Sequence, residues 1–218
     1  MELKGKKINF LGDSITEGHG TTGPAAFFST LIAEKYGALC RNYGIGGTRI
    51  ARQHTPSANL IWDDDFCHRA EAMDPDADLI VVFGGTNDFG HGDAPLGTFS
   101  DRSVYTFYGA LHTLYTTLIT RYPEAPIVIL TPLHRITEDN LRGDGNKEAD
   151  VADLKTYVNI IREVAEYYSL PVLDLYAESG LQPKVPVIQE KFVPDGLHPN
   201  DAGHRVLAEK IGAFLERL

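Results

Sequence analysis

The 218-residue sequence has very few cysteines and fewer basic than acidic residues. Its two cysteines, Cys40 and Cys67, cannot build the disulfide framework of a small secreted domain, and neither lies in a pattern typical of a catalytic thiol. Thirty acidic residues against twenty basic ones give a formal net charge of -10. Such a surface repels phosphate backbones and anionic lipids, so a nucleic acid is not expected as a partner.

Long apolar runs are also missing. No stretch approaches the ~20 apolar residues that a membrane-spanning helix needs, and the mostly charged first seven residues lead directly into a strand pattern. We therefore expect a cytoplasmic protein without a membrane span. With 43% hydrophobic residues and no repeat, linker or shift in composition, residues 1–218 are expected to form one domain.

Short apolar runs typical of buried strands alternate with segments of helical period. The predicted strands are 8–11, 39–43, 79–83, 127–130 and 172–175. The predicted helices are 25–36, 62–73, 104–122, 154–168 and a last one with its apolar face at 207–218. This alternation favours an α/β fold, a parallel sheet of five strands covered by helices on both faces.

Three polar, glycine-bearing segments lie between these elements and are predicted as loops. They are 88–100, 134–150 and 178–194. The second contains Gly143 and Gly145, and we expect it to be a mobile surface segment.

Small polar residues follow each of the first three predicted strands. Ser14 comes after the first strand, Gly47 after the second and Asn87 after the third. Because the carboxyl ends of parallel strands meet at one edge of a sheet, where ligands bind, these residues could be neighbours. Taken alone, each of these segments is also ordinary turn chemistry.

The loop 193–200 contains a carboxylate three residues before an imidazole, Asp195 and His198, with Gly196 available for a tight turn. A serine hydroxyl becomes a good nucleophile when an imidazole takes its proton and a carboxylate fixes the tautomer of that imidazole. Such chemistry requires Ser14, His198 and Asp195 together. The alternative interpretation is that these residues form only a turn followed by the start of a helix.

Several other site types are disfavoured by single residues. A dinucleotide-binding Gly-x-Gly-x-x-Gly pattern starting at Gly44 fails because Arg49 occupies the last glycine position. A Gly-x-Ser-x-Gly elbow around Ser14 fails because Thr16 stands at its final glycine. The histidines include no pair at metal-ligand spacing, so no metal site is expected.

Four blocks of the sequence together resemble the ordered motifs of the GDSL/SGNH hydrolase family. They are Gly12-Asp13-Ser14, Asn42-Tyr43-Gly44-Ile45-Gly46-Gly47, Gly85-Thr86-Asn87-Asp88 and Asp195-Gly196-Leu197-His198-Pro199. The resemblance extends over essentially the whole chain. It implies a flavodoxin-like three-layer α/β/α sandwich and serine esterase or lipase activity on a small-molecule ester, without a metal or organic cofactor.

The resemblance also implies a role for each matching residue. Ser14 would be the nucleophile, His198 the general base and then acid, and Asp195 the residue that orients His198. The oxyanion hole would consist of the backbone N–H of Ser14, the N–H of Gly47 and the side-chain amide of Asn87. Gly44 or Gly46 could replace Gly47, and Gly46 departs from the family pattern, in which a serine or similar small residue is common just before the oxyanion glycine.

The substrate is the least constrained part of the prediction. The three polar loops offer no long apolar stretch to line an acyl-chain channel. We therefore expect a small acyl group, acetyl in particular, on a polar alcohol such as a carbohydrate. A lysophospholipase or acyl thioesterase of the same family is the alternative, and a non-catalytic carbohydrate-binding relative is the alternative from another class.

Overall fold

The computed structural model describes residues 1–218 and contains one five-stranded parallel sheet with the strand order β2-β1-β3-β4-β5. This confirms the predicted α/β fold and its parallel sheet. The strands are β1 (Lys7–Gly12), β2 (Leu39–Gly44), β3 (Leu79–Phe83), β4 (Ile127–Leu130) and β5 (Val172–Leu173). The longer helices are α2 (Phe28–Tyr36), α3 (Phe66–Ala72), α5 (Phe107–Arg121), α6 (Leu154–Tyr167) and α9 (Asp201–Glu216).

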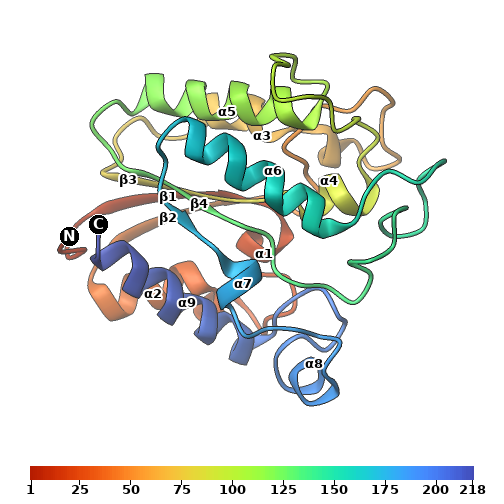
Figure 1. The fold of residues 1–218 in the computed structure, drawn as a ribbon. Helices are drawn as coiled ribbons and strands as arrows, with labels where there is room; N and C mark the ends of the chain where they lie inside the picture. The colour runs from red at the N-terminus through yellow and green to blue at the C-terminus, as the bar shows by residue number, and fades with distance from the viewer.

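Helices cover both faces of the sheet, and Figure 1 shows α3, α5 and α6 on one side and α2 and α9 on the other. Side chains of β3 alternate between the two resulting cores. Ile80 and Val82 pack beneath α3, α5 and α6, whereas Leu79, Val81 and Phe83 pack against α2 and α9. A strand with apolar side chains on both faces can only lie in the centre of such a sandwich.

Three helices begin later than the periodicity predicts, and a capping side chain sets the start of two of them. Asp65 accepts the N–H of His68 at 3.0 Å at the start of α3, and Thr106 accepts the N–H of Gly109 at 3.2 Å at the start of α5. The starts move from 25 to Phe28, from 62 to Phe66 and from 104 to Phe107. Residues before two of these helices form the 3₁₀ turns η1 (Pro24–Ala26) and η2 (Leu60–Asp63).

The predicted loops contain structure that the sequence did not indicate. Short helices occur at α4 (Thr86–His91) and α8 (Pro186–Phe192), and β5 ends two residues early because Asp174 caps α7 (Leu175–Glu178). The segment 134–150 has no helix or strand, as expected, but it is not simply a surface segment. Its Arg135 and Glu138 side chains are buried, so it is anchored to the body of the protein.

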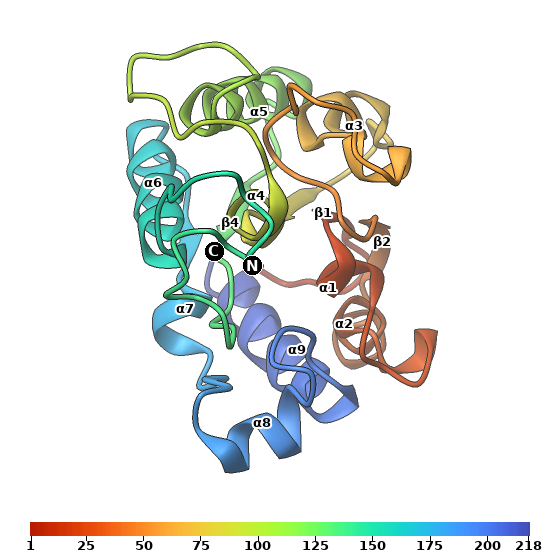
Figure 2. The same ribbon diagram turned by 90° about the vertical axis from the view of Figure 1, so that its right-hand side faces the viewer.

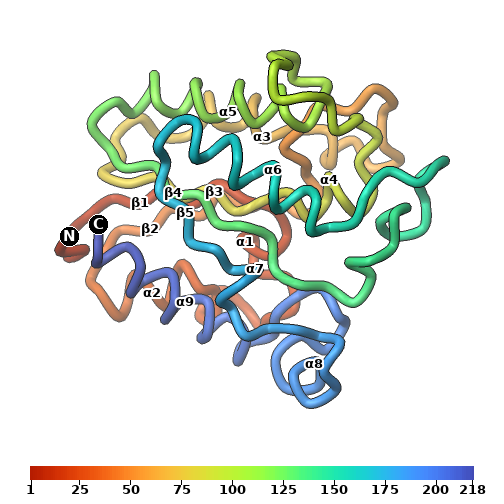
Figure 3. Tube along the Cα trace, viewed as in Figure 1, coloured from red at the N-terminus to blue at the C-terminus, as the bar shows by residue number.

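The strand order places a crevice at the carboxyl edge of the sheet. The chain moves from β1 outward to β2 and then returns to β3 on the other side of β1, and ligands bind at such a switch point. Figure 2 looks onto this edge, where α1 (Ser14–Glu17) and α4 lie close together. The two termini lie at the opposite edge (Figure 3), where the Met1 amino group donates to the carbonyl of Glu216. No helix is long and apolar enough to cross a membrane.

Candidate active site

Ser14 lies two residues after the end of β1, on the strand exit that the sequence predicted, and is the first residue of α1. The Asp13 carboxylate accepts the N–H of Ile15 at 3.0 Å and so caps the start of this short helix. Gly12 has no room for a side chain, since a Cβ there would lie 1.9 Å from the Oγ1 of Thr16. The turn that holds Ser14 is therefore tightly packed.

His198 reaches Ser14 from the far end of the chain. Its Nε2 lies 3.0 Å from the Oγ of Ser14, and its Nδ1 lies 2.7 Å from the Oδ2 of Asp195. An ionised carboxylate can only accept a hydrogen bond, so Nδ1 carries the proton and the Nε2 lone pair faces the serine hydroxyl. In this tautomer the imidazole can take the proton of Ser14.

Asp195 is oriented by its own loop. Its Oδ1 accepts the N–H of Leu197 at 2.8 Å and of His198 at 2.7 Å, and Gly196, which follows Asp195, has a φ of 80°. Burial alone would raise the pKa of Asp195, but these N–H donors and the His198 ring hold it below its ordinary value. Asp195 is therefore a carboxylate throughout the neutral range.

The loop after β2 leaves one backbone donor without an acceptor. Within residues 44–48, Gly47 is the only one whose N–H bonds to nothing within the chain, and its φ is 76°. The neighbouring N–H groups donate from Gly44 to Asn42, from Ile45 to Gly12, from Gly46 to Glu17 and from Thr48 to Ile45. Of the three glycines considered from the sequence, Gly47 is thus the one whose N–H is available to a ligand.

Asn87 and Ser14 offer further donors at the same edge. One amide hydrogen of Asn87 is used by the carbonyl of Thr48 at 3.0 Å, which leaves the second hydrogen of Nδ2 unused. The Ser14 N–H also has no acceptor within the chain. Asn87 is held in place relative to the loop of Gly47, because the neighbouring Asp88 accepts the N–H groups of Ile50 and Ala51 at 2.9 and 2.8 Å.

These groups surround a single cavity of about 390 Å³. Ser14, Gly47, Asn87 and His198 all line it, while Asp195 lies behind His198. The rest of its wall is formed by Glu17, His19, Ile45, Gly46, Asn59, Ile61, Trp62, His91, Asp144 and Leu197. The structure therefore brings together all five residues that the sequence singled out.

Several residues of the site were missed by the sequence analysis. Glu17 accepts the N–H of Gly46 at 2.7 Å and so fixes the peptide next to Gly47. A side chain at Gly46 would place its Cβ 2.8 Å from the Glu17 carboxylate, which explains the glycine at this position. The position of Glu17 three residues after Ser14, on the same helical turn, was the available signal.

His91 and Arg135 were harder to recognise from the sequence as residues in or near the site. His91 lies one helical turn after Asn87, but the segment was predicted as a loop, so the shared helix face was not recognised. Arg135 is buried, donates to the carbonyl of Thr86 at 3.1 Å and pairs with Asp144. An arginine in a polar segment gives no sign of such burial.

Burial changes the acid–base behaviour around the site. It raises the pKa of Asp13 to about 7, although Arg69 acts in the opposite direction. Burial and the positive charge of Arg49 lower the pKa of His91 to about 4. No group of three or more histidine, cysteine or acidic side chains is placed to hold a metal ion.

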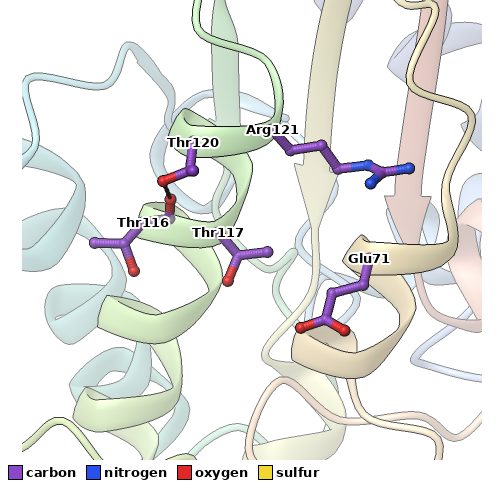
Figure 4. A pocket seen from close by; sticks show the side chains of 5 residues that line it. All are labelled: Glu71, Thr116, Thr117, Thr120 and Arg121. Carbon is purple, nitrogen blue, oxygen red and sulfur yellow. Dashed lines mark hydrogen bonds between the residues drawn. The ribbon is translucent and has the colours of Figure 1, made fainter.

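A second hollow lies between α3 and α5 (Figure 4). Its lining consists of Glu71, Thr116, Thr117, Thr120 and Arg121, without an imidazole or an apolar side chain. The Thr120 hydroxyl is already used by the carbonyl of Thr116 at 2.7 Å. This hollow has no group suited to activate a nucleophile, and the cavity at Ser14 is the stronger candidate.

The model of the GDSL-like lipase/acylhydrolase family matches residues 10–206. A solved structure from Lactobacillus plantarum is 32% identical, with 98% of each chain covered and a TM-score of 0.83. A two-domain esterase active on acetylated mannans is 21% identical, with a TM-score of 0.61 over 99% of this chain and 50% of that one. The comparison with curated proteins gives no match. By the family match over most of its length, the chain belongs to the GDSL-like lipase/acylhydrolase family.

Proposed function

We propose that the protein is a serine esterase that releases a small acyl group, acetyl in particular, from a polar alcohol such as a carbohydrate. The observation that carries the proposal is the continuous chain of contacts from Asp195 through His198 to Ser14, at 2.7 and 3.0 Å. These contacts lead to a cavity in which the N–H groups of Ser14 and Gly47 have no acceptor within the protein.

In the first half of the reaction, the Oγ of Ser14 attacks the ester carbonyl carbon while His198 takes the hydroxyl proton. The tetrahedral intermediate collapses, the bond to the alcohol breaks, and His198 gives its proton to the departing alcohol oxygen. In the second half, water attacks the acyl-serine with His198 again as base. The acid leaves and Ser14 recovers its proton.

The negative charge that develops on the carbonyl oxygen needs donors that are already in place. The N–H groups of Ser14 and Gly47 and the unused amide hydrogen of Asn87 are assigned this role. Asp195 keeps the productive tautomer of His198 and stabilises the imidazolium that forms after proton transfer.

The chemistry of the cavity wall supports a polar alcohol. Glu17, His19, Asn59, His91 and Asp144 all line it, so the hydroxyl groups of a substrate would find hydrogen-bond partners around the cavity. Its carboxylates also disfavour an anionic phosphate group on the substrate. The structural similarity to an esterase active on acetylated mannans fits this choice.

A second candidate is the hydrolysis of esters with longer acyl chains, as by a lysophospholipase or thioesterase. Leu60 and Ile61 favour it, since both are largely exposed and Ile61 lies at the cavity wall. A series of nitrophenyl esters from acetyl to dodecanoyl separates the two. We expect the highest kcat/KM at acetyl, and an optimum at octanoyl or longer without acetate release from acetylated oligosaccharides would favour the second candidate.

The hydrolase assignment itself is tested by Ser14→Ala. We expect turnover of nitrophenyl acetate to fall to near background with an unchanged circular dichroism spectrum. Undiminished hydrolysis by this variant would contradict the assignment of Ser14. If the wild type hydrolyses no ester but binds oligosaccharides, the protein is a non-catalytic binding relative.

A further inference from the structure

One wall of the cavity is formed by two neighbouring rings, those of Trp62 and His91, which are tilted relative to each other. Their centroids are 5.0 Å apart and their planes are inclined by 40°. Both residues line the cavity, and Trp62 is the only tryptophan of the chain. Neither has a role in the acyl-transfer steps described above.

The tautomer of His91 follows from its neighbour. The Nη1 of Arg49 lies 3.0 Å from the Nδ1 of His91, and a guanidinium can only donate. Nδ1 must therefore accept, and the ring proton is on Nε2, which has no partner within the chain. Because burial and Arg49 lower the pKa of His91 to about 4, the ring is a neutral donor at physiological pH.

The two rings are positioned next to the proposed oxyanion donors. His91 follows Asn87 by four residues on α4, so both lie on the same helix face. The indole packs directly against Gly47, since a Cβ at Gly47 would lie 2.2 Å from its Cδ1. Arg49 holds the other side of the wall by donating to the carbonyl of Trp62 at 3.2 Å. A ligand group on this wall would therefore lie beside the reacting ester.

The wall presents the indole ring of Trp62, the Nε2–H of His91 and nearby carboxylates. Glu17 and Asp144 are engaged by Gly46 and Arg135 but keep further lone pairs for hydroxyl donors. A sugar ring has a matching surface, because its C–H groups form an apolar face and its hydroxyls both donate and accept. A phosphate would meet the carboxylates, which repel it.

We infer that Trp62 and His91 form a subsite for one sugar ring of the substrate, packed against the indole, with the Nε2–H of His91 donating to an oxygen of that ring. This inference rests on the proposed function and specifies its substrate as an acetylated carbohydrate. It assigns Trp62 and His91 to substrate selection rather than to the reaction itself.

The single tryptophan allows a direct binding test that needs no turnover. In the Ser14→Ala protein, titration with acetylated mannotriose should change the fluorescence of Trp62 in a saturable way. Adding His91→Ala should weaken binding about three- to tenfold, the effect of one lost neutral hydrogen bond. His91→Gln, which can still accept from Arg49 and donate from its amide, should bind more tightly than His91→Ala. His68→Ala, an exposed histidine on α3 outside the cavity, is the matched control and should bind like its parent.

A kinetic ratio supplies the second test. In Trp62→Phe and His91→Gln, the kcat/KM for acetylated mannotriose divided by that for nitrophenyl acetate should fall relative to the wild type. If the wild type hydrolyses nitrophenyl acetate but Trp62 does not respond to acetylated mannotriose, or His91→Ala and His91→Gln bind as tightly as the parent, the subsite is wrong and the esterase proposal stands. If no ester is hydrolysed but binding depends on His91, the subsite stands and the esterase proposal fails.

Discussion

The site consists of two halves that are built in different ways. Ser14, Gly47 and Asn87 follow three neighbouring strands of the sheet, and Ser14 and Asn87 are each only 5% exposed. Asp195 and His198 lie on a loop near the end of the chain, where the Asp195 side chain is 53% exposed. One half is held by the packed core, and the other by hydrogen bonds within its own loop.

Two carboxyl groups, Asp13 beside the buried half and Asp195 in the exposed half, show how this difference affects ionisation. Burial raises the pKa of Asp13 to about 7, whereas N–H donors and His198 hold the pKa of Asp195 below its ordinary value despite partial burial. Ionising Asp13 costs free energy because the side chain is buried in the packed core. Asp195 is stabilised in its ionised form and is partly hydrated. We therefore expect Asn87→Ala in the buried half to cost more activity than Asp195→Asn in the exposed half.

The largest effect among these comparisons is expected for Asn87→Ala. It removes one fixed donor in a dry part of the site, and such a loss costs about 2.7 to 4 kcal/mol, on the order of 10² to 10³ in kcat. Steady-state kinetics on nitrophenyl acetate measure it. A loss below about fivefold would indicate that Asn87 serves only to hold the carbonyl of Thr48.

A smaller loss is expected for Asp195→Asn. The amide oxygen can still accept the N–H groups of Leu197 and His198, but the amide nitrogen would favour the unproductive tautomer of His198. A buried triad aspartate costs about 10⁴-fold when changed in this way. Because the Asp195 side chain is half exposed, water can accept the Nδ1–H of His198 and support the productive tautomer, so we expect about 10- to 100-fold here. A loss larger than that of Asn87→Ala would break the proposed contrast between the halves.

Removal of the Glu17 side chain is expected to cost still less activity. Glu17 lines the cavity and accepts the N–H of Gly46, the residue before Gly47. Glu17→Ala frees the N–H of Gly46 and loosens the peptide that presents Gly47, so kcat for nitrophenyl acetate should fall about three- to tenfold with little change in KM. Glu17→Gln retains an acceptor and should restore most of the activity. Equal losses in both variants would point to the charge of Glu17 rather than its hydrogen bond.

The smallest effect on activity, but a clear one on stability, is expected for Asp13→Asn. The native pKa of Asp13 is above its unfolded value, so the wild type loses stability as pH rises from about 4 to about 7. The asparagine variant lacks this loss. Its free energy of unfolding relative to the wild type should rise over that range, by about 4 kcal/mol at most, as measured by urea unfolding. A difference that is constant with pH would contradict the raised pKa.

The contrast between the halves also explains which features could be predicted from the sequence. Ser14, Gly47 and Asn87 were predictable because apolar runs mark the strands and a parallel sheet brings their ends together. The helix α4 was missed because no side chain caps its start, and its Asp88 binds the backbone of Ile50 and Ala51 nearly forty residues away.

Other residues were missed for the same non-local reason. In a polar segment of sequence, Arg135 is expected to be a solvated charge. Only its contacts with Thr86 and Asp144 show why it is buried. Trp62 was assigned to the first turn of a helix, and the cap at Asp65 instead leaves it on η2 at the cavity wall. Periodicity identifies strands and helices, but it contains no information on which side chain a buried polar group will meet.

The central claim is that Ser14 is a nucleophile activated by His198. Incubation with a serine-directed organophosphonate and intact-mass analysis test it most directly. We predict a single adduct on Ser14 of the wild type, no adduct on Ser14→Ala and a strongly slowed reaction of His198→Ala. A wild type that stays unlabelled, or an adduct that persists in Ser14→Ala, would contradict the account.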